Sequence, residues 1–416
     1  MTNLSDIIHI LPSMKSGDDL LSSMEVLPEY DESIRTAGVP MRLMALSDLY
    51  RIYVPSKMSL EIYSKMYLAL LRSLQKKGTK LAVQQKNQNY KAIIQKEYGG
   101  IMGGSDSFTI IGASGIGKSS AISRAITLIT ENRVIEVENP YTKTIPCICV
   151  QCPFDSSVKG LLLEILRKVD EMIESKYYEN ALRARTTTDM LIGSVSQVAL
   201  NHIGLLVVDE IQNVCNNKNG KSLVGMLTQL INNSGISICM VGTPESAVFF
   251  EQAVQLARRS LGLRYDVMEY GVDFRKFCEI VFSYQYVKIR TEITDGMIEW
   301  LYEHSSGNIS VVVSLIHDAQ EIAILNGKEV LNLESLNEAY QKRLSMLHGF
   351  IHMEQKKQTS KIKKKVSVVV TDVRTSAEEK YSGEFTIAGL VDDAKAENGD
   401  IVQLLKIHMP VVEVAV

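Results

Sequence analysis

The segment with the clearest chemical meaning is the run GASGIGKS, residues 112–119. It fits the pattern G-x-x-x-x-G-K-[ST], in which backbone N–H groups and the N-terminus of the next helix surround nucleotide phosphates. Lys118 would add a positive charge for the β- and γ-phosphates, and the Ser119 hydroxyl would be a ligand for Mg²⁺. We therefore expect ATP and Mg²⁺ as cofactors, bound by Gly112, Ala113, Ser114, Gly115, Ile116, Gly117, Lys118, Ser119 and Ser120.

Two adjacent carboxylates follow a later apolar run. In LLVVDEIQN, Asp209 and Glu210 come directly after four residues of strand character. Asp209 would share the Mg²⁺ with Ser119 and so joins the cofactor-binding and metal sets, while Glu210 would polarise the attacking water. The alternative is an acid pair on the surface. A protein that only bound nucleotide would not require Glu210.

The loop and the acid pair resemble those of AAA+ ATPases, and this resemblance gives roles to later residues. Thr243, at the end of ISICMVGT, fits the position whose hydroxyl orients water near the γ-phosphate, although a simple strand-end cap is the alternative. Arg258 and Arg259 are candidates for an arginine finger that reaches a neighbouring subunit's site, and Arg264 is a weaker one. Their alternatives are surface charges or DNA contacts. Ser310 stands where AAA+ lids carry a nucleotide-sensing arginine, so we expect that contact to be absent.

Alternating strands and helices must position these residues. The strand before the glycine loop is Ser107–Ile111, and Ser119–Thr130 continues as a helix. Four further runs have strand character, with helices between them, so we expect a parallel sheet covered on both faces. The runs are Ile145–Val150, Ile203–Val208, Ile236–Val241 and Tyr265–Tyr270, and the helices include Val158–Tyr177 and Lys221–Ile231.

The segments on either side of this core are helical. Before it, helical spacing of apolar residues appears over Ser59–Leu74 and a basic helical stretch over Lys80–Tyr98, preceded by residues that look like an arm with marginal structure. After Asp273 the pattern is wholly helical, with helices over Asp295–His304, Ile309–Asn326 and Leu333–Leu347.

We therefore predict an α/β fold: an AAA+ P-loop core with a parallel sheet flanked by helices, followed by a small α-helical lid. The predicted parts are a partner-binding arm (1–58), a basic helical extension (59–104), the ATPase domain (105–273), the lid (274–350) and a basic, then acidic, partner-binding tail (351–416).

Composition and charge narrow the class of protein. Hydrophobic content of 45% and charged content of 22% over 416 residues are ordinary for a globular protein. No run of about 20 apolar residues and no signal peptide appear, so we expect a cytoplasmic protein without a membrane partner. The spacing C-x-C-x-x-C at Cys147, Cys149 and Cys152 could suggest a metal site, but a strand without an obvious fourth ligand favours buried, reduced thiols.

Charge lies in blocks along the chain. Residues 51–100 hold ten bases against two acids, and residues 351–375 hold seven against two. Two basic zones that flank the ATPase core fit a polyanion partner such as double-stranded DNA. The alternative is that they are solvated helix faces.

Five segments together look like the TnsC/TniB group of AAA+ transposition regulators: GASGIGKS, LLVVDEIQN, SGISICMVGTPES, ARRSLG and SSGNIS. The resemblance covers roughly Ile62 to Leu347. It implies subunits that assemble on DNA as a ring or helical filament, link a target-selector protein to the transposase subunits, and disassemble after ATP hydrolysis. By the same analogy, the N-terminal arm would face the selector, and the tail would contact the transposase. The alternatives are another DNA-associated AAA+ ATPase, such as an initiator or a signalling ATPase, or a DNA-binding scaffold with negligible turnover.

Overall fold

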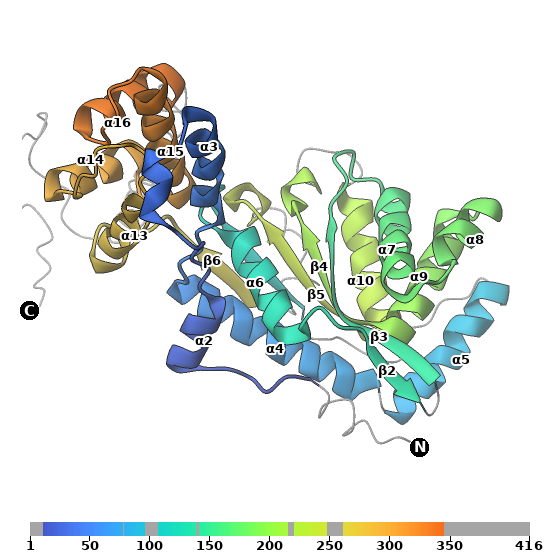
Figure 1. The fold of residues 1–416 in the computed structure, drawn as a ribbon. Coiled ribbons are helices and arrows are strands. Elements are labelled where there is room, and N and C mark those ends of the chain that lie inside the picture. Colours follow the sequence, from blue (N-terminus) through green and yellow to red (C-terminus); the bar gives the residue numbers. More distant parts are fainter. Residues whose placement is uncertain are drawn as a thin grey trace, which may run out of the picture. The chain divides into compact units, whose positions relative to one another are not determined.

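A six-stranded sheet forms the centre of the described chain (Figure 1). The computed structural model describes residues 11–77, 79–95, 107–138, 141–214, 220–247 and 261–344. The strand order is β2-β3-β4-β5-β1-β6, and all neighbours run parallel except the antiparallel pair β2 and β3. The strands are β1 (Phe108–Gly112), β2 (Ile135–Glu138), β3 (Tyr141–Gln151), β4 (Ile203–Asp209), β5 (Ser237–Gly242) and β6 (Leu261–Tyr265).

Helices cover both faces of this sheet, which confirms the predicted α/β class. On one face, α4 (Lys57–Lys77) and α6 (Lys118–Thr130) pack on the side chains of Leu205 and Val207. On the other face, α7 (Val158–Ile173), α9 (Thr188–His202) and α10 (Gly220–Ser234) pack on Leu206 and Val208. This alternation along β4 is the period of two that a strand buried on both faces requires. Two further helices, α5 (Lys80–Gln95) and α8 (Tyr177–Arg183), flank α9 and α7.

The register brings the carboxyl ends of the central strands to one edge. Gln151 of β3 pairs with Asp209 of β4, and Ile111 of β1 pairs with Gly242 of β5. The loop after β1 and the residues after β4 and β5 therefore emerge together, where parallel sheets bind ligands.

The lid is helical, as the sequence pattern predicted, and its hydrophobic core also includes residues of the N-terminal segment. Its helices are α13 (Val272–Ser283), α14 (Asp295–Ser305), α15 (Ile309–Leu325) and α16 (Leu333–Ala339), followed by a π-helical turn, Tyr340–Leu344. Gly327, with φ of +74°, follows the end of α15 in the left-handed conformation expected of a C-terminal cap. Within the described residues no single helix could cross a membrane, although the bent pair α14–α15 passes on combined length and composition.

The N-terminal segment is folded, which differs from the expected marginal arm. It contains α2 (Gly17–Met24), a 3-10 turn η1 (Glu32–Thr36), α3 (Val39–Ala45) and a second turn η2 (Leu46–Arg51). Leu20 and Met24 belong to the core formed by α4 and α6, whereas Leu46 and Leu49 belong to the lid core.

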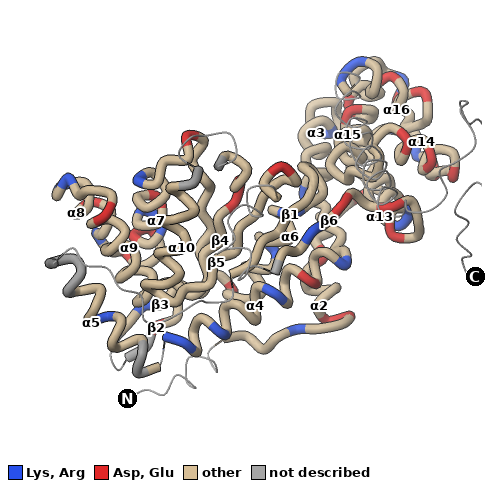
Figure 2. The backbone as a smooth tube through the Cα atoms, turned by 180° about the vertical axis from the view of Figure 1, so that it is seen from behind, with Lys and Arg blue, Asp and Glu red and all other residues tan. Residues whose placement is uncertain are grey.

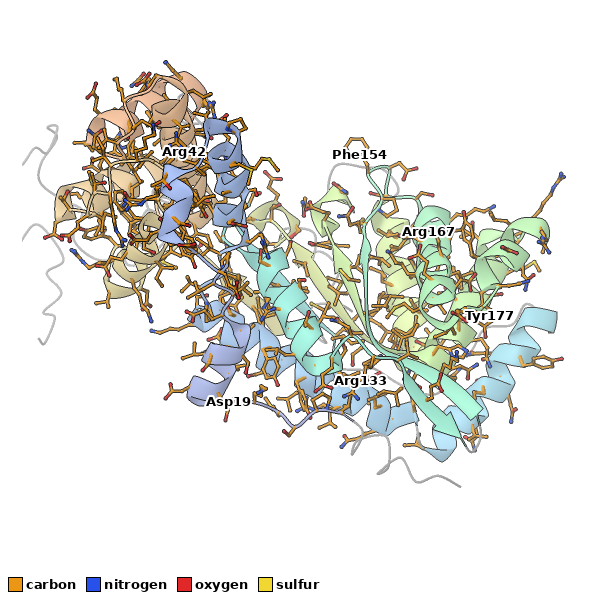
Figure 3. All side chains as sticks on the ribbon, in the orientation of Figure 1. Asp19, Arg42, Arg133, Phe154, Arg167 and Tyr177 are labelled. Atoms are coloured by element: carbon orange, nitrogen blue, oxygen red, sulfur yellow. The ribbon has the colours of Figure 1, made fainter. Side chains whose placement is uncertain are left out.

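A buried ion pair fixes the middle of this segment. The Arg42 side chain, labelled in Figure 3, is fully buried, and its guanidinium donates to both carboxylate oxygens of Glu329, at 2.6 and 2.7 Å. It also donates to the carbonyls of Ala37 and Tyr286. A short backbone bridge between Val26 and Tyr53 closes the segment on itself.

Other elements differ from the predictions in detail. The strand expected at Tyr265–Tyr270 is β6, which ends where that run begins, and β2 and α9 were not predicted. Cys147 and Cys152 are buried as expected, but Cys149 is exposed. The three thiols do not meet in a metal-binding cluster within the described ranges. The predicted tail lies outside the described residues.

Candidate nucleotide site

One cavity of about 340 Å³ lies at the carboxyl edge of the sheet. Its walls come from four parts of the chain: the loop after β1, the residues after β4 and β5, the N-terminal segment, and helices α13 and α15 of the lid. Most of the predicted site residues contribute to these walls. They are Ser114, Gly115, Gly117, Lys118, Ser119, Ser120, Asp209, Glu210 and Thr243.

The glycine loop joins β1 to α6, as its motif requires. Gly115 and Gly117 have φ of +81° and +90°, values that side chains disfavour. The loop's other predicted members, Gly112, Ala113 and Ile116, do not line the cavity; Ala113 and Ile116 are buried behind it. The Lys118 ammonium donates to the carbonyls of Gly112 and Ala113, each at 2.7 Å. These hydrogen bonds keep the cation at the mouth of the loop, where phosphate oxygens could replace the carbonyls.

Ser119 and Asp209 meet although they are far apart in the sequence. Ser119 Oγ donates to Asp209 Oδ2 at 3.0 Å, and the Glu210 N–H donates to Asp209 Oδ1 at 2.8 Å. A hydroxyl and a carboxylate side by side are the hard oxygen ligands that Mg²⁺ prefers, with water completing its octahedron. The pair therefore fits the predicted metal.

Glu210 holds an uncommon backbone conformation. Its φ is +57°, the left-handed region that few residues other than glycine adopt, and its side chain is exposed at the cavity. Such conformations cost on the order of 1–3 kcal/mol and cluster at functional sites. The side-chain amide of Gln212 donates a hydrogen bond to Glu210 Oε2.

Thr243 directly follows β5, and its hydroxyl is buried without a partner. Thr243 Oγ1 makes no hydrogen bond within the described part of the chain, although the residue lines the cavity. Its backbone N–H donates to Gln212 Oε1 at 3.3 Å. Leaving a buried hydroxyl unpaired costs about 1–3 kcal/mol, so the site is suited to a polar ligand that would satisfy it.

The N-terminus of lid helix α15 contacts the glycine loop directly. The Asn308 side chain donates to the Ser114 carbonyl at 2.8 Å, and the Ser310 N–H donates to the Gly115 carbonyl at 3.2 Å. Asn308 also caps its own helix, because its Oδ1 accepts from the Ser310 N–H at 3.1 Å. Ser310 thus lies at the cavity, and no arginine is among the lining residues.

One part of the cavity wall, here called the apolar end, is apolar and aromatic. It is lined by Leu49, Tyr50, Ile52, Tyr53 and Val54 of the N-terminal segment and by Phe277, Ile309 and Val313 of the lid. Apolar and aromatic side chains of this kind suit the apolar part of a ligand. Sequence reasoning missed this end, because it assigned the N-terminal segment to partner binding.

Two predicted residues, Arg258 and Arg259, lie outside the described residues. Arg264 is exposed on β6 and does not line the cavity. Reasoning from motifs also missed Gln212 and Asn308. Gln212 stands within the quoted segment LLVVDEIQN, and Asn308 is a typical N-cap residue, so both had a sequence signal.

The sequence of this core matches a known family. Residues 102–264 match the family model described as "Bacterial TniB protein". This segment includes the glycine loop, the acid pair and Thr243, and the match confirms the resemblance to TniB proteins. Among curated proteins, none matches the sequence.

Solved structures resemble the chain at low sequence identity. The Orc1 protein of Aeropyrum pernix, solved in complex with DNA, is 14% identical with a TM-score of 0.42; the match covers 63% of this chain and 65% of that one, just under two thirds of its length. A Walker-type ATPase of Pyrococcus abyssi is 12% identical with a TM-score of 0.37, covering 78% and 88%. Domain III of the replication initiation protein DnaA of Thermotoga maritima is 13% identical with a TM-score of 0.35, covering 62% and 89%.

Proposed function

We propose that this chain, a TniB protein over residues 102–264, is an ATP-hydrolysing regulator of DNA transposition that assembles on double-stranded DNA. One observation carries the ATPase part. Around a single cavity lie a cation, a metal-ligand pair, a candidate base and an unpaired hydroxyl: Lys118, Ser119 with Asp209, Glu210 and Thr243. The family supports the transposition part.

Each of these side chains has a place in phosphoryl transfer to water. Lys118 would exchange its two carbonyl partners for phosphate oxygens. When bound to Ser119 and Asp209, Mg²⁺ would supply charge neutralisation at the β- and γ-phosphates. Glu210 would accept a proton from the attacking water, and the Thr243 hydroxyl would hold that water or a γ-phosphate oxygen.

The apolar end of the cavity would hold the base of the nucleotide. Aromatic rings of Tyr50, Tyr53 and Phe277 offer faces on which an adenine can pack. These residues come from the N-terminal segment and the lid, so a bound nucleotide would contact both segments as well as the sheet edge. This would make nucleotide binding a natural trigger for assembly.

The DNA part of the proposal depends on charge. Within the described residues, most of the basic zone lies in α4 and α5, and Figure 2 shows Lys and Arg at intervals along α4. Backbone binding needs such clustered cations and no base-reading motif. Lys77 is a poor candidate, because its ammonium donates to the carbonyls of Ala199 and Ile203. The links to a target selector and to transposase subunits belong to the same proposal.

Electron microscopy of the protein with duplex DNA tests the assembly. We expect rings or filaments with ATP or a non-hydrolysable analogue, and none without nucleotide. Unchanged monomers under all three conditions would contradict the proposal. Lys118→Ala should lose both nucleotide binding and assembly, whereas Lys168→Ala, an exposed lysine paired with Glu171, should retain both.

The variant Glu210→Gln separates a hydrolase from a scaffold. It should bind ATP with unchanged affinity, lose turnover by roughly 10²–10⁴-fold, and remain assembled on DNA after ATP is added. Turnover equal to that of the wild type would show that Glu210 is not the base.

A further inference from the structure

Gln212 connects the candidate base to the strand that carries Thr243. It lies in the 3-10 turn η3 (Ile211–Val214), directly after β4. The Nε2 atom of its side-chain amide donates to Glu210 Oε2, and the Oε1 atom of the same amide accepts from the Thr243 N–H at 3.3 Å. These contacts span the gap between two neighbouring strand ends.

The orientation of this amide is fixed by its partners. A backbone N–H can only donate, so the Gln212 oxygen must face Thr243. The Nε2 group then faces the Glu210 carboxylate, which can only accept when ionised. A glutamine satisfies both partners while remaining neutral, which neither a carboxylate nor a lysine could do.

Gly242 allows the turn to approach β5 this closely. A Cβ atom at position 242 would lie 2.7 Å from Ile211 Cγ2 and 3.1 Å from Gln212 Oε1. Both distances are shorter than ordinary contacts. The absence of a side chain at the end of β5 is therefore what lets Gln212 reach the Thr243 N–H.

From this geometry we infer that Gln212 is a positioning residue for ATP hydrolysis: it orients the Glu210 carboxylate and sets its place relative to Thr243. Glu210 is exposed and stands on a left-handed backbone, so its carboxylate would otherwise rotate. Gln212 fixes Oε2, while no described residue bonds to Oε1, which stays available for the attacking water. This inference rests on the proposed ATPase function.

The variant Gln212→Met tests it, because methionine has a similar length and makes neither hydrogen bond. We expect kcat to fall roughly 10–100-fold, since misplacing a base by about 1 Å has an effect of this size. The KM for ATP and the Kd for a non-hydrolysable analogue should stay within about twofold of wild type. Gln75→Met, an exposed glutamine on α4, serves as the control and should change none of these values.

A second variant, Gln212→Glu, separates the two hydrogen bonds. It retains an acceptor for the Thr243 N–H but places a carboxylate against Glu210. We expect kcat to fall, because a carboxylate at position 212 would repel the Glu210 carboxylate and turn it away from the place that the Gln212 amide gives it.

Two results would overturn the positioning role. One is a kcat for Gln212→Met equal to that of wild type while Glu210→Gln is inactive. The other is a loss of ATP affinity and thermal stability in proportion to the loss of kcat, which would show a structural role. The kcat values of all variants are measured in one buffer that contains duplex DNA. If no ordered assemblies form, the proposed function is refuted, but the comparison of kcat values still tests the role of Gln212.

Discussion

At the level of single residues, the hydroxyl of Thr243 is the clearest sign that the cavity suits a polar ligand. It is buried, lines the cavity and lacks a hydrogen-bond partner in the described chain. Folding alone gives no reason to keep such a group, since an unpaired buried hydroxyl destabilises a protein. The Gln212 amide connects Thr243 to Glu210, so the proposed hydrolysis of ATP gives a reason to keep the hydroxyl.

Replacing this residue should therefore separate stability from activity. Thr243→Val keeps the shape and removes only the hydroxyl, so the free energy of unfolding should stay level or rise by about 1 kcal/mol. The kcat for ATP should fall roughly 10–100-fold. Urea denaturation and steady-state kinetics measure the two effects.

One outcome would contradict this prediction. If Thr243→Val lowers stability by several kcal/mol, the hydroxyl has a structural partner and is only a strand-end cap. Thr228→Val on α10 is the matched control, because that hydroxyl donates to the Val224 carbonyl at 2.9 Å and should show no effect on kcat.

Residues in a contiguous motif are easier to predict from the sequence than residues whose role depends on contacts between distant segments. Lys118, Ser119, Asp209 and Glu210 follow from two short patterns, and the structure brings all four to one cavity. Gln212 and Asn308 have types that suit several roles. Their contacts depend on which distant segments meet, and a single sequence does not state that.

At the level of elements, the N-terminus of α15 joins the lid to the glycine loop. Asn308 both caps the helix and donates to the Ser114 carbonyl. Ser310 adds a backbone hydrogen bond to Gly115. The lid therefore contacts the loop through uncharged groups at the place where an arginine was sought.

Asn308→Ala should weaken nucleotide binding as well as the lid. Loss of the cap should lower the free energy of unfolding by about 1 kcal/mol. Because the contact to Ser114 is lost too, the Kd for ATP should rise by roughly 5–10-fold, an effect of about 1 kcal/mol. Calorimetric titration measures this change.

The lid offers a matched control. Asn332 caps α16 with a full capping box and lies outside the cavity lining. Asn332→Ala should cost similar stability and leave the Kd unchanged. Equal effects of both variants on the Kd would mean that general loosening of the lid, and not the contact with the loop, controls affinity.

Elements with a clear pattern of apolar residues were predicted well, and elements without such a pattern were missed. The central strands of the parallel sheet are continuous apolar runs, and the lid helices show helical spacing. In contrast, α9 packs against α5, α7 and α10, so apolar residues surround it and its periodicity is weak. The four-residue β2 alternates with glutamates at a sheet edge, a pattern that a loop can share.

At the level of the whole described unit, residues 11–52 contribute side chains to two hydrophobic cores. Leu20 and Met24 lie in the core under the sheet, and Arg124 donates to the carbonyls of Ser23 and Met24. Further along, Leu46 and Leu49 lie in the lid core. The segment predicted as a partner-binding arm is thus part of both cores, and any partner must bind its outer surface.

Arg42 is the electrostatic anchor of this segment, and removing it should be costly. The Glu329 side chain is only 13% exposed, and Arg42→Ala would remove the bidentate partner of its carboxylate. The free energy of unfolding should fall by about 3–5 kcal/mol. Hydrogen bonds from Arg42 lower the pKa of Glu329, so this stabilisation should be present at neutral pH and decline as the pH falls below about 4.5.

Urea denaturation at neutral and acid pH tests this prediction. Arg51→Ala is the control, because its pair with Asp48 is exposed and should contribute less than about 1 kcal/mol. The double variant Arg42→Met with Glu329→Met should recover much of the loss. A loss for Arg42→Ala as small as the control's would mean that the apolar contacts alone hold the segment.

The glycine at position 115 carries a requirement that the nucleotide motif does not. In G-x-x-x-x-G-K-[ST] this position is free to vary, yet here a Cβ atom would come within 2.3 Å of Ser310 Oγ and 2.7 Å of Asn308 Oδ1. An alanine at this position would still satisfy any search for the motif. It would nevertheless strain a backbone that has φ of +81° and displace the side chains of Ser310 and Asn308. The contact between the loop and the N-terminus of α15 therefore depends on a residue that the motif leaves unspecified.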